Sequence, residues 1–264
     1  MTNTLSVAHE HKEAFKVFYA ASLLHIPNNK KIVSSNFRKF KKAIEQKMLQ
    51  MAADKLNSLF GDEFMNQVMI DFEFNPYTGI ANSGGTDFCF ENPELDITIN
   101  FNTNLRALYK KDLRLFCLTL ADIFTHELIH CIQYIKQYQS IGVKEDLLKE
   151  TIFKNKEHLF KLDPRYNTMG QYYEDLPYFS KHEELVCYAK DSARQLLTVY
   201  KDKNIVISKL SNVSELKDLS EASDCFYYYY DCFYARIPEL RQYQLLWKSF
   251  TKHLYHNLHE DFEI

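Results

Sequence analysis

The stretch that decides the fold is residues 111–138, KDLRLFCLTLADIFTHELIHCIQYIKQY. Its apolar side chains recur at three- and four-residue steps and cover most of the circumference of a helix, a pattern typical of a helix buried in a protein. Burying polar groups in such a helix costs free energy unless they have partners. Because His126, Glu127 and His130 lie in the middle of this stretch, they require an explanation.

Amphipathic patterns on both sides of this stretch predict a largely helical protein. Apolar residues at helical spacing predict further helices at 8–25, 33–60, 144–161, 180–203, 221–236 and 237–259. Between two of these, we expect residues 204–220 to be a polar connection containing one short strand at 205–207. With only 6 Gly and 6 Pro in 264 residues, long helices are favoured over a turn-rich β architecture.

The hydrophobic period becomes alternating only between residues 67 and 102. Val68, Ile70, Phe72 and Phe74 alternate with polar or acidic residues, which predicts a half-buried strand. Two further short strands are expected at 88–90 and 97–101. The fold class is therefore α+β, predominantly helical, with a small antiparallel or mixed sheet beside the buried helix.

We expect a single domain over residues 1–264, made of three parts. Residues 1–66 form an N-terminal helical part, residues 67–200 form a core that holds the sheet and the central helix, and residues 201–264 form a C-terminal helical part. A chain of this length has ample material for one such core.

Composition and charge exclude several classes of protein. The net charge of -3 disfavours a nucleic-acid partner, which would require a basic face. Charged residues at 9–13 occupy the place of a signal-peptide core, and no run reaches the roughly 18 apolar residues of a membrane helix. Six cysteines without CxxC pairing indicate free thiols in a reducing compartment. We therefore expect a cytoplasmic protein without a membrane partner.

The polar cluster in the central helix has the spacing of a zinc site. His126 and His130 are four residues apart, so on a helix their imidazoles project from one face, one turn apart. Two neutral imidazoles at that separation can share a tetrahedral Zn²⁺. Glu127 lies beside the first ligand, where it can act as general base toward the water that the ion activates.

A catalytic zinc needs a third protein ligand and one open position. Residues 131–140 contain no His that would extend the motif, so we expect the third ligand on the helix that begins near Ser180. Glu184 is the preferred candidate because the small residues that follow it would allow close helix packing. Glu183 and His182 are its rivals at the start of the same helix.

HELIH at 126–130, followed by HEELVCYAKDSA at 182–193, resembles the gluzincin group of zinc peptidases. The likeness is strongest to small peptidase-like proteins of bacteriophages and bacteria, in which an E-x-x-A-Y-A segment follows the HExxH helix. The resemblance implies a zincin-like fold, Zn²⁺ as cofactor, and a peptide or protein substrate. It implies His126, His130 and Glu184 as metal ligands and Glu127 as the base.

The sequence departs from the gluzincin pattern at two places. Cys187 stands where the pattern has Ala, and Tyr188 stands where the thermolysin-type signature has an Asp that orients the first His. Asp122 and Asp191 are both candidates to replace that Asp.

The residue that stabilises the oxyanion and the substrate-binding strand are further expectations. Tyr188 and His182 are the candidate catalytic donors, with Tyr178 as an alternative. In zinc peptidases of this type, an edge strand beside the motif helix binds the substrate backbone by strand addition, and 97–101 is the predicted strand.

Two other functions remain open from the sequence. One is a non-catalytic binding or structural protein that keeps a zincin fold, for example an inhibitor or a virion component. If the chain is phage-encoded, the expected location is the cytoplasm of the host cell. The other is a protease that acts on nucleic-acid-bound proteins. The presence of Glu127 favours an enzyme over the first, and the absence of a basic face disfavours the second. His253, His256 and His259, three residues apart, are expected to form a solvent-facing helix stripe.

Overall fold

The computed structural model describes residues 7–25, 34–66, 68–75, 83–91, 94–102, 113–141, 176–235 and 241–259. The helix predicted at 144–161 lies outside these residues. The chain divides into two compact units, one of residues 9–145 and one of residues 146–264 with 1–8. The single domain expected from the sequence stays a prediction, and the two units are described separately.

The unit of residues 9–145 contains the helices predicted for this part of the chain. They are α1 (Val7–His25), α2 (Ser34–Phe60), the short α3 (Asp62–Met65) and α5 (Leu113–Ile141). Helix α2 ends before Gly61, which adopts a φ of 84° that only glycine reaches without strain. Helix α5 is the long central helix that opened the sequence analysis, and most of its side chains are buried.

A three-stranded mixed sheet lies in the same unit. Its strands β1 (Val68–Asn75), β2 (Ser83–Glu91) and β3 (Glu94–Asn102) stand in the order β1-β3-β2. Strand β3 is parallel to β1, with Ile70 beside Ile97, and antiparallel to β2, with Thr86 beside Ile99. Residues 97–101 therefore lie in the central strand. The prediction that they form the edge strand was wrong, because β1 pairs with β3 on the side opposite to β2.

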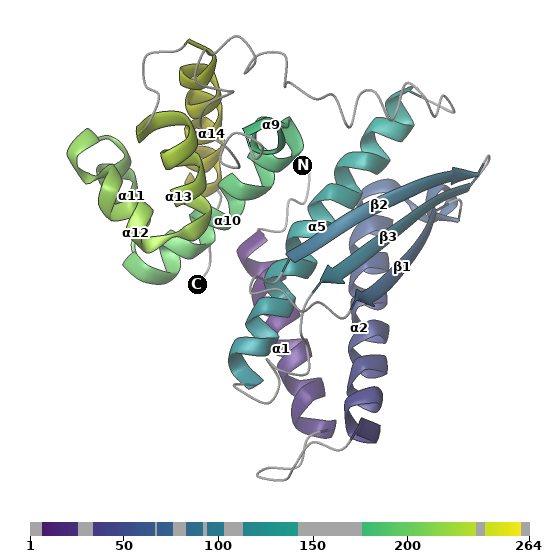
Figure 1. Ribbon diagram of the computed structural model, residues 1–264. Helices are drawn as coiled ribbons and strands as arrows, with labels where there is room; N and C mark the ends of the chain where they lie inside the picture. The colour runs from purple at the N-terminus through teal and green to yellow at the C-terminus, as the bar shows by residue number, and fades with distance from the viewer. Residues whose placement is uncertain are drawn as a thin grey trace. The chain divides into compact units, whose positions relative to one another are not determined.

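Aromatic side chains join the sheet to the helices of this unit. Alternate residues of β3, from Leu95 to Phe101, are at most 1% exposed. Phe124 of α5 meets Phe18 of α1 and Phe72 of β1 with ring centroids 5.8 and 6.0 Å apart. Figure 1 shows α1, α2 and α5 running beside this sheet. The core of the unit is thus built around α5, which fixes the position of anything α5 carries.

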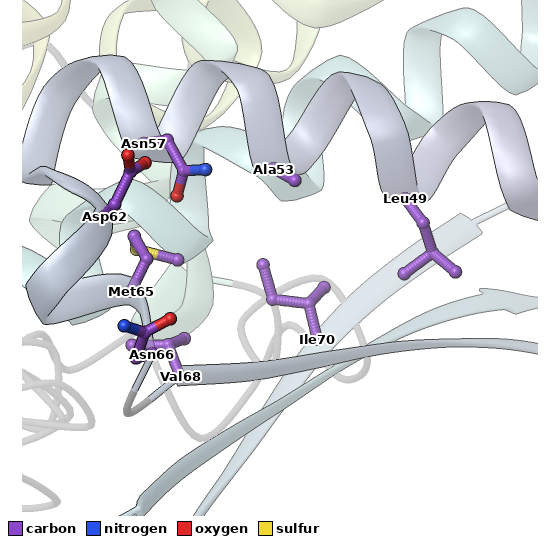
Figure 2. Close-up of a pocket in the computed structure, with 8 residues that line it drawn as sticks. All are labelled: Leu49, Ala53, Asn57, Asp62, Met65, Asn66, Val68 and Ile70. Carbon is purple, nitrogen blue, oxygen red and sulfur yellow. The ribbon is translucent and has the colours of Figure 1, made fainter.

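An open groove runs between α2, α3 and the outer edge of the sheet at β1. Its volume is about 570 Å³, and Figure 2 shows side chains of α2, among them Leu49 and Ala53, facing Val68 and Ile70 across it. Asp62 is the one titratable side chain among its lining residues. The groove lies at β1, whereas β2, the opposite edge, approaches the polar cluster of α5.

The unit of residues 146–264 is helical throughout its described part. After the short α9 (Leu176–Phe179) come α10 (His182–Tyr200), α11 (Lys203–Leu210), the 3₁₀ turn η1 (Val213–Glu215), α12 (Leu216–Ala222), α13 (Asp224–Tyr230), the π-helical turn η2 (Asp231–Ala235) and α14 (Arg241–His259). Figure 1 draws these helices in green to yellow. Tyr229 is at their centre: its ring stacks on Phe250 at 4.2 Å, and its hydroxyl donates to the Phe179 carbonyl at 2.8 Å.

Residues 204–220 are helical, so their prediction as a polar connection with a strand at 205–207 was wrong. The Asp202 side chain accepts a hydrogen bond from the Asn204 amide and begins α11. Val206 is buried while Ile205 is exposed and Ile207 half-buried, which is a helical and not an alternating pattern. The helix predicted at 221–236 is interrupted at Ser223, whose hydroxyl accepts from the Phe226 amide and begins α13.

The predicted fold class is confirmed at the level of an α+β protein, mostly helical, with a small mixed sheet. Residues Leu113–Gln139 of α5 are long and apolar enough to cross a membrane, but 67% of the best window is buried, as in the core helix of a soluble protein.

Candidate metal centre

The two histidines of α5 lie together, as their spacing predicts. The ring centroids of His126 and His130 are 5.0 Å apart, and their ligand atoms lie within 4.8 Å of each other. His130 is buried and His126 is half-buried. One α-helical turn therefore presents two imidazoles on the same face, which is the arrangement that a shared metal ion requires.

Gln133 holds the ring of His130. Its Oε1 lies 3.2 Å from His130 Nδ1. A side-chain amide oxygen accepts hydrogen bonds, so this contact favours the tautomer with the proton on Nδ1, which leaves the lone pair of Nε2 available to a metal. The sequence analysis missed Gln133, although its position three residues after His130 on the helix was a usable signal.

Glu127 is 4% exposed and is held by strand β2. The Thr86 hydroxyl donates to Glu127 Oε2 at 2.7 Å and lies 3.3 Å from the Glu127 carbonyl oxygen. A buried carboxylate requires such a donor, because unpaired burial of a charge is costly. Thr86 was not identified from the sequence, since 41 residues separate it from Glu127.

Gly84 allows β2 to come this close to α5. A Cβ at position 84 would stand 2.7 Å from Ile123 Cγ2 and 2.8 Å from Glu127 Cγ, and closer still to Glu127 Oε1. Only glycine fits at such a distance. Gly85 next to it has no heavy atom within 4 Å of the corresponding position. Packing therefore requires glycine at position 84 but not at position 85.

The cysteines of α5 are buried, as predicted. Burial raises the pKa of the Cys117 thiol to about 11. Burial, and secondarily the negative charge of Glu127, raise the pKa of Cys131 well above its usual range. Both side chains are thus neutral thiols at physiological pH and serve as core residues.

Helix α10 carries the remaining predicted site residues in the other unit. Glu184 and Cys187 are buried, and Glu183 is half-buried. Burial, and next the charge of Glu184, raise the pKa of the Tyr188 phenol, which therefore stays protonated and can donate a hydrogen bond at neutral pH. His182 is exposed, and its ring lies against His253 of α14. The roles predicted for Glu184, Tyr188 and His182 stay predictions.

The two carboxylates proposed to orient His126 have partners within their own units. Asp122 Oδ1 lies 2.7 Å from His11 Nε2 of α1. Asp191 Oδ1 lies 3.9 Å from Arg194 Nε, one turn further along α10. Each carboxylate therefore has a basic side chain of its own unit nearby, and the assignment of either as the orienting group stays a prediction.

His126 and His130 carry ligand atoms within 4.8 Å of each other and could contribute to a metal site, and Cys187 of α10 offers a thiol as a further donor type. The histidines belong to the unit of residues 9–145, whereas Cys187 belongs to the other. Imidazole nitrogen and thiolate sulfur are both ordinary ligands of Zn²⁺. Cys187 was treated from the sequence as a departure from a family pattern, and its chemistry makes it a ligand candidate in its own right.

The hydrogen bond from Thr86 to Glu127 leads to a first prediction. Thr86→Val keeps the shape of the side chain but removes the hydroxyl that donates to the buried carboxylate, so we expect a loss of stability of about 1–3 kcal/mol. Thr86→Ser keeps the hydroxyl and should lose less. Urea denaturation of the three proteins measures the difference. A Thr86→Val protein as stable as the wild-type protein would mean that the hydrogen bond contributes nothing to stability.

No family model, curated protein or solved structure matches this chain. The function of the centre is therefore interpreted from its own geometry.

Proposed function

We propose that this protein is a zinc-dependent metallopeptidase with a zincin-like fold. The observation that carries the proposal is the arrangement on α5: two imidazoles one turn apart, with the buried Glu127 between them held by Thr86 of β2. A buried helix beside a small mixed sheet supports the fold. The gluzincin-like pattern of residues 126–130 and 182–193 supports the activity.

The residues present fit a zinc ion. His126 and His130 would hold it through ring nitrogens, and the contact of His130 Nδ1 with Gln133 supplies the second hydrogen bond that ligating histidines usually make. Zinc at such a site acts as a Lewis acid, which makes water a usable nucleophile near neutral pH.

The base in this proposal is Glu127. Its carboxylate accepts a proton from the attacking water and returns it to the leaving amine. Thr86 fixes one carboxylate oxygen, Oε2, and Oε1 lies next to Gly84 of the same strand, so β2 sets the position of the carboxylate. Tyr188, whose phenol stays protonated, is the proposed donor to the developing oxyanion, with His182 as the alternative.

Strand β2 replaces 97–101 as the proposed substrate-binding strand. It is an edge of the described sheet, and its residues Gly84 and Thr86 lie against Glu127. An extended peptide that adds to this edge pairs through main-chain hydrogen bonds, which suits a peptide or protein substrate.

Helix α10 supplies the third metal ligand in this proposal. Glu184 is the ligand that the gluzincin resemblance implies, and Cys187 is the ligand that the donor chemistry offers. We expect Glu184→Gln to lower zinc affinity at least about tenfold, since a lost ligand costs no less than a lost supporting contact. Zinc titration against a chromogenic chelator measures this for Glu184→Gln, its rival Glu183→Gln and Cys187→Ser, with the exposed Glu221→Gln of α12 as the control.

Each outcome of that titration decides a point. Loss of zinc with Glu184→Gln alone supports the gluzincin-type site. Loss of zinc with Cys187→Ser alone assigns the third ligand to the thiol. It would mean that the gluzincin pattern does not describe the ligands of this site. Unchanged affinity in both variants means that neither Glu184 nor Cys187 supplies the ligand.

A further inference from the structure

Two histidines from different helices meet in the unit of residues 146–264. His182 is the first residue of α10 and His253 lies in the second half of α14. Their ring centroids are 5.5 Å apart with an interplanar angle of 64°. This pair lies outside the candidate centre on α5, and the proposed function uses His182 only as an alternative donor.

Packing between α10 and α14 fixes the two rings relative to each other. Leu246, Phe250 and Leu254 of α14 are buried in the core that they share with Leu185 of α10. The His253 carbonyl accepts a hydrogen bond from the buried Asn257 side chain at 2.8 Å. The ligand positions are thus preorganised by two packed helices, which lowers the entropic cost of binding an ion.

The chemistry of the pair suits a transition metal. Neutral imidazole is a preferred ligand of Cu²⁺, Ni²⁺ and Zn²⁺. Burial, followed by the positive charges of His182, Lys252 and His256, lowers the pKa of His253. Its ring is therefore neutral at physiological pH, the form that can bind a metal.

We propose that His182 and His253 form a second metal site, which binds one divalent transition-metal ion through a nitrogen of each ring and completes its coordination with water. The bound ion would tie the first turn of α10 to α14. The site shares neither His126 nor His130 with the proposed peptidase centre, and His253 has no part in that centre.

The main competing interpretation is an ion held by α14 alone. His253, His256 and His259 recur every three residues along that helix, and such a stripe can bind ions without α10. His182 distinguishes the two, because it is the one ligand of the proposed pair that α14 does not carry.

Trp247 gives a direct readout of this site. It is the one Trp of the chain and lies six residues before His253 on α14, about 9 Å along the helix axis. Cu²⁺ bound at this distance quenches indole fluorescence. We therefore expect Cu²⁺ titration of the full chain carrying His130→Ala, which removes the α5 centre, to give saturable quenching at one ion per chain.

Variants test the assignment. His182→Ala and His253→Ala should each raise the half-saturating Cu²⁺ concentration at least about tenfold, whereas His259→Ala, also exposed on α14, should leave it unchanged. His182→Gln repeats the test with a polar side chain of similar reach. Because all four variants also carry His130→Ala, failure of the α5 centre would not alter their ranking.

The proposal is overturned if either His182 variant binds Cu²⁺ as tightly as the protein with His130→Ala alone, because α14 would then hold the ion alone. Absence of saturable quenching in the protein with His130→Ala alone would overturn it as well.

Discussion

Glu127→Gln is expected to abolish peptide hydrolysis while zinc content stays at the wild-type level. A general base contributes about 10²–10⁴ in rate, and glutamine cannot accept the proton. The substitution keeps the size of a side chain that is 4% exposed, and its amide oxygen can still accept from Thr86. Loss of activity would thus come from chemistry and not from misfolding.

Cleavage of casein and of a fluorogenic peptide library, with zinc measured on the same samples, tests this expectation. Glu183→Gln removes a carboxylate that the proposal does not use as the base, and it is the matched control. Equal cleavage by Glu127→Gln and the wild-type protein would remove the catalytic claim even if zinc is bound.

Gly84→Ala is expected to be the most damaging single-methyl substitution near the centre. The added Cβ would overlap the side chains of Glu127 and Ile123, so either β2 moves away from α5 or the carboxylate is displaced. Overpacking of this kind costs about 1–3 kcal/mol. Because Glu127 is the first side chain to be displaced, we expect peptide cleavage to fall together with stability.

Gly85→Ala is the matched control, since a Cβ there meets nothing within 4 Å. Both variants exchange a glycine for alanine in the same strand, so propensity effects are shared. In both urea denaturation and peptide cleavage, Gly84→Ala should fall below the wild-type protein and Gly85→Ala should stay close to it. Equal behaviour of the two variants would mean that the close approach of Gly84 to Glu127 has no consequence.

Much of the fold could be predicted from local patterns. Residues 113–141 are helical and buried because their apolar side chains surround the helix, and the alternation at 68–74 correctly predicted β1. Strand order could not be predicted in this way. Whether 97–101 lies at an edge or in the centre depends on pairing with β1, which is a long-range contact without a local signal.

At residues 203–210 a local signal was present but misleading. The run Ile205-Val206-Ile207 is β-branched and favours a strand by propensity. Burial of Val206 alone, together with the Asp202 cap, instead produces a helix. Tertiary packing decided the outcome, as it commonly does for short apolar runs.

Some residues of the candidate centre could be predicted from the sequence and others could not. His126, Glu127 and His130 could be identified because their chemistry is encoded in spacing along one helix. Thr86 and Gly84 could not be, because they reach Glu127 from a strand more than forty residues away. Two glycines in a turn-rich stretch carry no sign that one of them faces a carboxylate.

The measurement that tests the central claim most directly is the metal content of the purified protein. Elemental analysis is done on proteins that carry His253→Ala, which removes the second proposed site: this protein alone, and with His126→Ala, His130→Ala or the control His25→Ala added. About one zinc per chain is expected in His253→Ala alone and with His25→Ala added. Both α5 variants should lose it. A His253→Ala protein that remains free of metal after reconstitution with Zn²⁺, or proteins with His126→Ala and His130→Ala added that retain a full equivalent, would contradict the account.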